Sequence, residues 1–384
     1  MTPAADIVAA LLSVTGGKAG LHEPEIAGNE WAYVKDCLDT NWVSSVGAYV
    51  DRFEAMLAAF TGAGHAVATV NGTAALHVCL MLAGVKAGDE VIVPTLTFVA
   101  TANAVAYCGA VPHFVDSSET TLGLDPVKLE VRLRDSARAE GGRLVNRETG
   151  RPIAAVVVMH AFGHPVDLDP VAEVCRRHGL PLIEDAAESL GSTYKGRHCG
   201  TTGVLAALSF NGNKIVTTGG GGAVLTSDPD LARAAKHLTT TAKLPHRWEF
   251  IHDRIGYNYR LPNLNAAMGC AQLERLPGFV ERKRALAERY REAVAPLSGL
   301  RFVSEPPHCR SNYWLNGLLL DPGNAERRDE VLDALNGAGV MSRPAWTPMH
   351  RLPAFSECPR GDLSSAEGIV RRLINIPSSP GLAA

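Results

Sequence analysis

Short apolar runs alternate with longer amphipathic segments over about the first 240 residues of the chain. The apolar runs are rich in valine, isoleucine and alanine, and they cover residues 65–70, 89–94, 110–116, 153–163, 181–185, 204–210 and 221–227. Helix-like patterns separate several of these runs, at 71–85, 97–109 and 169–178. Such alternation predicts βαβ units, which build a mostly parallel, buried sheet. We therefore expect one doubly wound α/β domain from about residue 21 to about residue 240.

The pattern changes near residue 250. Pro262 and Asn263 stand at the start of residues 263–294, which carry many charged pairs. Both features are typical of one long helix. The rest mixes the strand-like NYWLNGLLL with the helix-like AERRDEVLDALNGAG, which is an α+β pattern. We predict a large domain over residues 1–250, with a short amphipathic helix in its N-terminal segment, and a smaller C-terminal α+β domain over residues 251–384.

Composition and charge narrow the class of protein. The 384 residues are 46% hydrophobic and 20% charged, which is typical of a folded globule with a sizeable core. The net charge of -3 comes from well-mixed charges without a basic run, which argues against nucleic acid as a partner. No basic residue precedes Lys18, so the N-terminus lacks the charged start of a secretion signal.

Residues 91–115 contain no Asp, Glu, Lys or Arg and are long enough to be considered as a membrane span. Proline, asparagine and glycine interrupt them, so a strand, a helix and a second strand are the better interpretation. The eight cysteines stand singly, without the spacing of a zinc site. We expect a cytoplasmic protein with reduced thiols, no bound metal and no membrane attachment.

The segment SFNGNKIVTTGGGG, residues 209–222, places Lys214 between a predicted strand and four glycines. It differs from a nucleoside triphosphate loop, in which the glycines precede the lysine and a helix follows. The uncharged surroundings of Lys214 leave two interpretations: a surface lysine whose stem covers apolar residues, or a desolvated, reactive amine. The glycines are also compatible with a simple flexible turn between strands.

Two other segments bear on this choice. Residues 71–80, NGTAALHVCL, begin a helix directly after a strand, and its first amides at Gly72, Thr73 and Ala74 suit a phosphate, although any capped helix looks the same. Asp185 ends a buried strand, where open α/β sheets bind ligands, and a helix N-cap is its alternative role. Together with Lys214 these features match pyridoxal 5′-phosphate, whose aldehyde needs a lysine, whose ring nitrogen needs a carboxylate and whose phosphate needs a helix start.

Blocks along essentially the whole chain support this hypothesis. They read NWVSSVGAYVDRFE, NGTAALH, DEVIVPTLTFVATANAV, IEDAAESLGS, SFNGNKIVTTGGGG, GYNYRLPNLNAA and INIPSS. In content and order they resemble the DegT/DnrJ/EryC1/StrS sugar aminotransferases, which have the type I, aspartate aminotransferase-like fold of pyridoxal phosphate enzymes. NWVSSVG and the GNK form of the lysine loop look most like enzymes that aminate C4 of nucleotide-linked 4-keto-6-deoxy sugars, as on the bacillosamine, legionaminic acid and perosamine routes.

The resemblance implies roles for matching positions. Lys214 would bind the cofactor and move a proton, and Asp185 would pair with the pyridine nitrogen. Phe98 would stack on one face of the ring and Ala187 would pack on the other, while Glu188, often glutamine in relatives, would lie near the phenolic oxygen. The phosphate would be held by Gly72, Thr73, Ala74 and Ser209, and by Asn258 of the partner subunit, so that a homodimer shares its active sites.

Other interpretations of some of these residues stay open. Phe98 could be plain core, Ser209 could satisfy backbone groups, and Asn258 could be a turn residue. Four further residues lie in segments that could line a sugar-nucleotide cleft or touch the cofactor: His160, Trp314, Arg343 and His350. A core histidine with satisfied hydrogen bonds is the alternative for His160.

The resemblance also implies the reaction. L-glutamate would donate the amino group, and a nucleotide-linked 4-keto-6-deoxy sugar would accept it at C4, in bacterial surface-glycan or sugar biosynthesis. Transfer at C3, and a non-catalytic regulator of the same fold that binds a sugar nucleotide, are the alternatives. Lys214 argues against a sugar dehydratase of this family, because those enzymes have histidine in its place.

Overall fold

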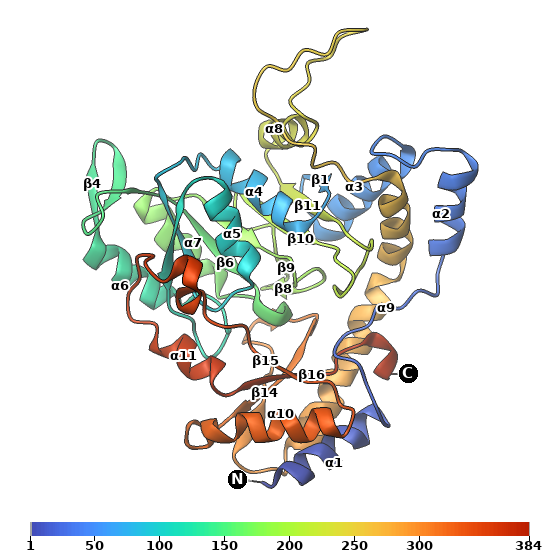
Figure 1. The fold of residues 1–384 in the computed structure, drawn as a ribbon, viewed down its shortest axis with the longest axis vertical. Helices are drawn as coiled ribbons and strands as arrows, with labels where there is room; N and C mark the ends of the chain where they lie inside the picture. Colours follow the sequence, from blue (N-terminus) through green and yellow to red (C-terminus); the bar gives the residue numbers. More distant parts are fainter. Residues whose placement is uncertain (1, 384) are drawn as a thin grey trace.

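The computed structural model describes residues 2–383 and shows a large sheet covered by helices, with a smaller region below it (Figure 1). The main path of the nine-stranded sheet has the order β1 (His65–Thr69), β11 (Gly222–Thr226), β10 (Leu205–Ser209), β7 (Leu182–Asp185), β6 (Pro152–Met159), β2 (Glu90–Pro94) and β3 (Val111–Val115). β11 is antiparallel to both of its neighbours, and all other neighbours on this path are parallel. The predicted α/β fold with a mostly parallel sheet is confirmed.

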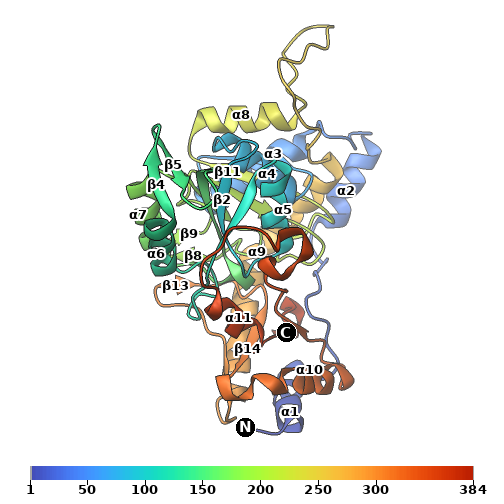
Figure 2. The ribbon, with the colours of Figure 1, turned by 60° about the vertical axis from the view of Figure 1, so that its left-hand side comes forward.

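Helices cover both faces of this sheet (Figure 2). They are α3 (Ala48–Thr61), α4 (Gly72–Leu82), α5 (Val99–Tyr107), α6 (Pro126–Ser136), α7 (Leu168–His178) and α8 (Pro229–Thr239). Successive side chains of a strand point to opposite faces. Val91 and Val93 of β2 therefore pack with α4, α5 and α8, whereas Ile92 packs with α6 and α7. Burial on both faces explains why these strands are almost entirely apolar.

The strand ends and the segments that follow them bring four predicted site residues to one edge of the sheet. Gly72 begins α4 after β1, Phe98 precedes α5 after β2, Asp185 ends β7 and Ser209 ends β10. Because parallel strands have their carboxyl ends at the same edge, these residues lie together although they are far apart in sequence.

A β-hairpin that the sequence patterns do not indicate extends the sheet. β4 (Ala137–Glu140) pairs with β5 (Arg143–Asn146), and β5 pairs antiparallel with β6. Its exposed, charged residues lack apolar alternation, so tertiary contacts hold it instead. Asn146 Nδ2 donates to the fully buried Glu90 at 2.8 Å, and Arg143 forms an ion pair with Asp89 at 2.9 Å.

The predicted long helix has the expected bounds: α9 spans Asn263–Val294 and connects the two parts of the molecule (Figure 1). It packs against α2 (Glu30–Asp39), α3 and the N-terminal helix α1 (Ala4–Thr15). Asn263 fixes its first turn, since Asn263 Nδ2 donates to the carbonyl of Trp42 at 2.7 Å and Asn263 Oδ1 accepts the N–H of Tyr49 at 3.1 Å.

The C-terminal region contains a four-stranded sheet and two helices. The sheet has the order β12 (Leu300–Phe302), β14 (Asn316–Leu320), β16 (Leu373–Ile376) and β15 (Arg343–Pro344), and the helices are α10 (Arg328–Gly337) and α11 (Ser364–Val370). A small three-stranded sheet joins this region to the large one, with the order β13 (Cys309–Arg310), β8 (Thr193–Tyr194) and β9 (Arg197–His198).

The N-terminal helix does not pack on the large sheet. Ile7 and Leu11 of α1 share a buried cluster with Leu286 of α9 and Leu335 of α10, and Figure 1 shows α1 beside α10. The predicted large domain over residues 1–250 includes this segment, because neighbours in sequence are the natural first guess. Its apolar face instead completes the core of the C-terminal elements. The domain boundary near residue 250 stays a prediction.

Three structural observations concern the uncharged segment 91–115, membrane-spanning helices and the cysteines. Residues 91–115 form β2, α5 and β3, the predicted order of strand, helix and strand. Among residues 2–383, no helix is long and apolar enough to cross a membrane. The eight cysteines are free thiols.

Candidate active site

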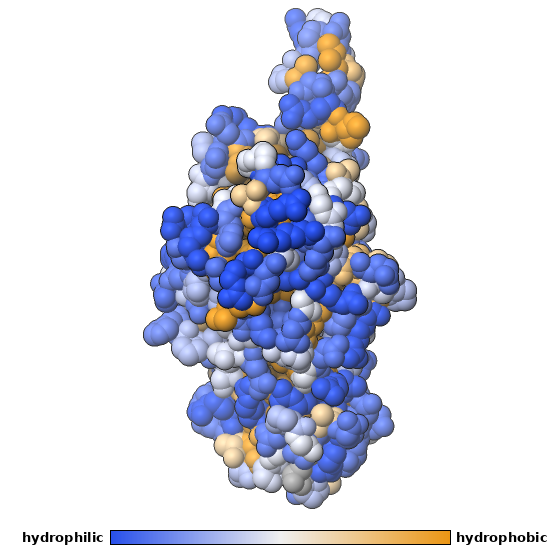
Figure 3. Space-filling view, turned by 90° about the vertical axis from the view of Figure 1, so that its left-hand side faces the viewer, coloured by the Kyte–Doolittle hydropathy of each residue, from blue (hydrophilic) through white to orange (hydrophobic). Residues whose placement is uncertain are grey.

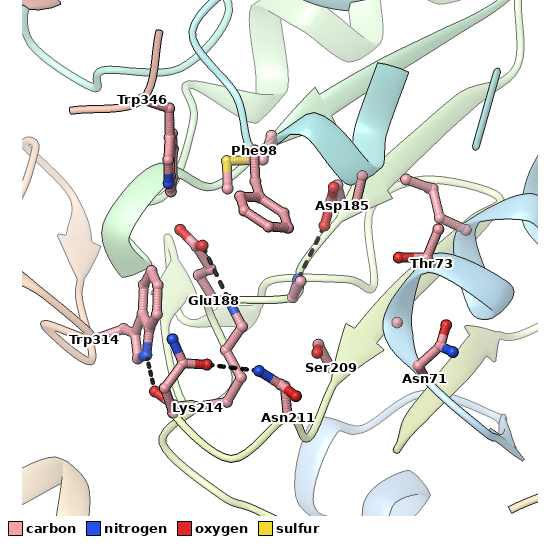
Figure 4. Close-up of a pocket in the computed structure, with 16 residues that line it drawn as sticks. Asn71, Thr73, Phe98, Asp185, Glu188, Ser209, Asn211, Lys214, Trp314 and Trp346 are labelled. Atoms are coloured by element: carbon pink, nitrogen blue, oxygen red, sulfur yellow. Dashed lines mark hydrogen bonds and ion pairs between the residues drawn. The ribbon is translucent and has the colours of Figure 1, made fainter. Parts of the chain in front are cut away.

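A pocket of about 350 Å³ opens at the carboxyl edge of the large sheet (Figure 4). Its walls come from the start of α4, the loops after β2, β7 and β10, and two segments of the C-terminal region. Nine residues named in the sequence analysis line it: Gly72, Thr73, Phe98, Asp185, Ala187, Glu188, Ser209, Lys214 and Trp314. The residues that the sequence analysis did not name are Asn71, Leu76, Ala100, Met159, Asn211, Asn213 and Trp346.

Lys214 lies in the loop after β10, and its side chain runs beside Glu188 and Trp314 (Figure 4). Its Nζ donates to Glu188 Oε1 at 3.0 Å and lies 3.8 Å from the centre of the Trp314 ring. Only 11% of the Lys214 side chain is exposed. Lys214 is therefore not an exposed surface lysine, and a role as a reactive amine stays a prediction.

The loop that carries Lys214 is fixed by hydrogen bonds. Trp314 Nε1 donates to the carbonyl of Asn213 at 2.7 Å, and the N–H of Lys214 donates to the carbonyl of Asn211 at 2.9 Å. Asn211 Nδ2 also donates to Asn213 Oδ1 at 3.1 Å. These bonds tie the loop after β10 to the C-terminal region, so both regions set the position of the amine.

Glu188 is the buried partner of Lys214. Its side chain is 1% exposed, and its Oε2 accepts the N–H of Phe162 at 2.9 Å. Burial raises the pKa of Glu188 to about 7, and the charge of Lys214 opposes that rise only in part. The carboxylic acid and the carboxylate are therefore both accessible near neutral pH.

Asp185 lies at the end of β7, in the interior of the same pocket. Its Oδ2 accepts the hydroxyl of Thr101 at 2.7 Å, and its Oδ1 accepts the N–H of Ala187 at 3.2 Å. Burial raises the pKa of Asp185, and these neutral donors counteract the rise only in part. A positively charged partner would stabilise the carboxylate, and a protonated ring nitrogen is such a partner.

The helix α4 begins at the opposite side of the pocket from the two tryptophans (Figure 4). Asn71 caps it, because its Oδ1 accepts the N–H of Ala74 at 2.8 Å. The first backbone bond of the helix runs from Ala75 N–H to the carbonyl of Asn71. The N–H groups of Gly72 and Thr73 precede that bond, so the helix leaves them available for an anion.

Two glycines let the backbone approach closely at this end. A Cβ atom on Gly72 would lie 2.8 Å from the Cβ of Ser209, and one on Gly222 would lie 2.5 Å from the carbonyl carbon of Asn71. Only glycine fits such contacts, so Gly222, the last of the four glycines, does more than form a flexible turn.

Aromatic rings from three separate segments form the other end of the pocket. The Trp346 ring stacks on the Phe162 ring with centroids 4.5 Å apart, and the Phe98 ring meets Trp346 edge to face at 6.1 Å. Phe98 is 47% exposed, so it faces open space and is not plain core. Trp346 lies in the segment SRPAWTPMH, whose predicted cleft residues are Arg343 and His350. The only signal for it was an aromatic residue within an already suspected segment.

Five predicted residues do not line this pocket. His160 is buried with both ring nitrogens bonded, to Glu184 at 3.0 Å and to Val166 N–H at 3.1 Å, as a core histidine would be. Of the other four, Ala74 lines a neighbouring hollow. The side chains of the remaining three bond to residues outside the pocket: Asn258, Arg343 and His350. Any role of these residues toward a ligand stays a prediction.

The residues of the pocket fit pyridoxal 5′-phosphate. Asp185 is a buried carboxylate that lacks a cationic hydrogen-bond donor, Lys214 supplies a shielded amine, and α4 presents unbonded amides. These three features match the ring nitrogen, the aldehyde and the phosphate of that group. The exposed face of Phe98 suits a flat ring.

Comparisons with known proteins agree with this geometry. The model of the DegT/DnrJ/EryC1/StrS aminotransferase family matches residues 24–384. The chain is 39% identical over 363 residues to GDP-perosamine synthase of Caulobacter vibrioides, with 94% of this chain and 92% of the relative covered. It is 37% identical over 363 residues to GDP-perosamine synthase of Escherichia coli O157:H7, with 94% of each covered.

A solved structure shows the same likeness in three dimensions. The aminotransferase TlmJ from Streptoalloteichus hindustanus matches with a TM-score of 0.85 and 32% identity, and the match covers 94% of each chain. The type I fold expected from the sequence is thereby confirmed. The chain therefore belongs to the DegT/DnrJ/EryC1/StrS aminotransferase family, whose enzymes depend on pyridoxal phosphate.

Proposed function

We propose that this aminotransferase binds pyridoxal 5′-phosphate at Lys214 and moves an amino group from L-glutamate to C4 of a nucleotide-linked 4-keto-6-deoxy sugar. The observation that carries the proposal is one pocket that holds a shielded amine, a buried carboxylate and a helix start. The likeness to two GDP-perosamine synthases supports the sugar and favours C4 over C3.

The proposal assigns a separate role to each group of residues that lines the pocket. The cofactor, when bound, supplies an electron sink for the carbon that loses its proton. Asp185 would stabilise the positive charge of the ring nitrogen, Phe98 and Ala187 would contact the ring, and Lys214 would move a proton at its Nζ. Gly72, Thr73 and Ser209, which line the pocket, would hold the phosphate.

The aromatic end of the pocket suits the sugar. Trp346 stands across the pocket from the helix start, so it is on the far side from the predicted phosphate site (Figure 4). A 6-deoxy sugar offers C–H groups and a methyl group, which pack well on aromatic faces. We assign this end to the keto sugar, and Trp314 above Lys214 borders the same space.

A homodimer is part of the proposal. The segment between α8 and α9 projects from the body of the molecule and carries exposed apolar side chains, visible as orange at the top of Figure 3. The exposed apolar residues of this segment are Leu244, Phe250, Ile251 and Ile255, and the aromatic Trp248 is exposed among them. Exposed apolar groups of this kind mark contact surfaces. Asn258, exposed at the base of the segment, would reach the phosphate site of a second copy.

The visible absorption spectrum of the purified protein tests the proposal. With pyridoxal phosphate supplied, a band from the covalently attached cofactor should form and then disappear when L-glutamate is added. A 4-keto-6-deoxy sugar nucleotide should restore the band and yield the 4-amino sugar, identified by mass spectrometry and NMR. Restoration without a 4-amino product would favour transfer at C3, and a protein that forms no band would favour the non-catalytic regulator.

A further inference from the structure

We propose that Glu188 is the proton acceptor of Lys214. A proton moves from Lys214 Nζ to Glu188 Oε1, which converts an ammonium and a carboxylate into a neutral amine and a carboxylic acid. The reverse transfer restores the ion pair, and no other bond forms or breaks. The inference rests on the proposed function, in which Lys214 is the group that binds the cofactor.

The contact geometry supports this exchange. The two atoms lie 3.0 Å apart, within hydrogen-bond distance, and Glu188 is 1% exposed. The N–H of Phe162 binds Oε2, which leaves Oε1 facing Lys214. An ammonium must lose a proton before it attacks a carbonyl, and buried surroundings keep solvent from taking that proton.

The groups around Lys214 and Glu188 act in opposite directions on the protonation of Glu188. The charge of Lys214 and the N–H of Phe162 favour the carboxylate of Glu188. Burial and the nearby charge of Asp185 favour the carboxylic acid. Because these influences oppose one another, the pKa of Glu188 is raised to about 7, so its carboxyl group can take up and release a proton near neutral pH.

The backbone around Phe162 is shaped for this contact. Phe162 has φ 59° and ψ 14°, a left-handed conformation that is strained for a residue with a side chain. The neighbouring Gly163, with φ +94°, is packed so tightly that a Cβ there would collide with Asn312. The turn therefore holds the Phe162 N–H against Glu188 at the expense of local strain, as is common at functional sites.

The Glu188→Gln variant tests the proposal, because glutamine can still accept the Phe162 N–H but cannot take a proton from Lys214. The measurement is the rate at which cofactor-free enzyme binds added pyridoxal phosphate covalently, followed by visible absorbance from pH 5.5 to 9.5. The wild-type rate should rise with pH through about 7. In Glu188→Gln the rise should move to the alkaline side, and the rate at pH 7.5 should fall about 100-fold.

Two further variants complete the experiment. Glu54 is a matched control, because it also accepts from a lysine, Lys236 at 2.6 Å, and from a backbone N–H, that of Ala68 at 2.8 Å, but lies outside the pocket. Glu54→Gln should bind the cofactor at the wild-type rate. Glu188→Asp retains a carboxyl group and should recover the rise near neutral pH even if its rate is lower.

The outcomes separate this inference from the proposed function. If wild type and Glu188→Gln bind the cofactor at the same rate with the same pH profile, the role of Glu188 is overturned and that of Lys214 stands. If wild type binds no cofactor covalently, both proposals are overturned. Should Glu188→Gln prove unfolded by circular dichroism, the profile of Glu188→Asp decides, since only a titrating carboxyl group preserves the rise.

Discussion

The two ends of the pocket are built in different ways. At the phosphate end, Asn71, Asp185 and Ser209 lie at or directly after strand ends of one sheet, so the sheet alone brings them together. At the aromatic end, Trp314 precedes β14 and Trp346 follows β15, so this end exists only when the C-terminal region packs on the large one. The phosphate end, which we assign to the cofactor, is therefore predictable from local sequence pattern. The aromatic end, which we assign to the substrate, forms only where the two regions pack together.

Lys214 stands between these ends, and its loss should break both. In Lys214→Arg the guanidinium cannot bind an aldehyde in the same way or release a proton near neutral pH, so turnover should fall at least about 10⁴-fold. Stopped-flow and steady-state assays with L-glutamate and the keto sugar check this. Near-normal multiple turnover in this variant would contradict the role of Lys214.

The Asp185→Asn variant should damage the cofactor end alone. The amide keeps the size of the side chain and can still accept the hydroxyl of Thr101, but it carries no charge to stabilise a protonated ring nitrogen. We expect turnover to fall about 1,000-fold, the upper range for loss of one electrostatic contact in an active site. Both half-reactions should slow together, so a defect confined to the sugar step would argue against this assignment.

The Trp346→Leu variant should damage the substrate end alone. Loss of the ring removes aromatic contacts of about 0.5–1.5 kcal/mol, so KM for the keto sugar nucleotide should rise roughly 2- to 13-fold. The half-reaction with L-glutamate should keep its rate, and Trp346→Phe should lie between wild type and Trp346→Leu. Equal effects on both half-reactions would place Trp346 in cofactor binding instead.

The smallest effect is expected from the cap of α4. Asn71→Ala should lower the free energy of unfolding by about 1 kcal/mol and also weaken binding of pyridoxal phosphate. Asp125 offers a matched control, because it caps α6 by accepting the N–H groups of Val127 and Lys128. Asp125→Ala should lose similar stability in urea unfolding but retain cofactor affinity; equal affinities in the two variants would remove Asn71 from the phosphate site.

Parts of the fold and site could be read from sequence because they depend on short-range pattern. The alternation of apolar runs predicted the strands of the main sheet, and charged pairs predicted α9 at 263–294. The hairpin of β4 and β5 escaped prediction because Glu90 and Asp89, about 50 residues earlier in the chain, hold it. Trp346 escaped because nothing in its own segment shows what lies opposite its ring.

By itself, then, the sequence determined the α/β class, the strand-end positions of Asp185 and Ser209, and the helix start at Gly72. These depend on hydrophobic period and on the rule that parallel strands end at one edge. Tertiary structure alone decided the burial of Lys214 against Glu188 and Trp314, and the packing of α1 with α9 and α10. Burial, charge pairing and proton exchange arise from residues that meet only after the chain has folded, so no local pattern contains them.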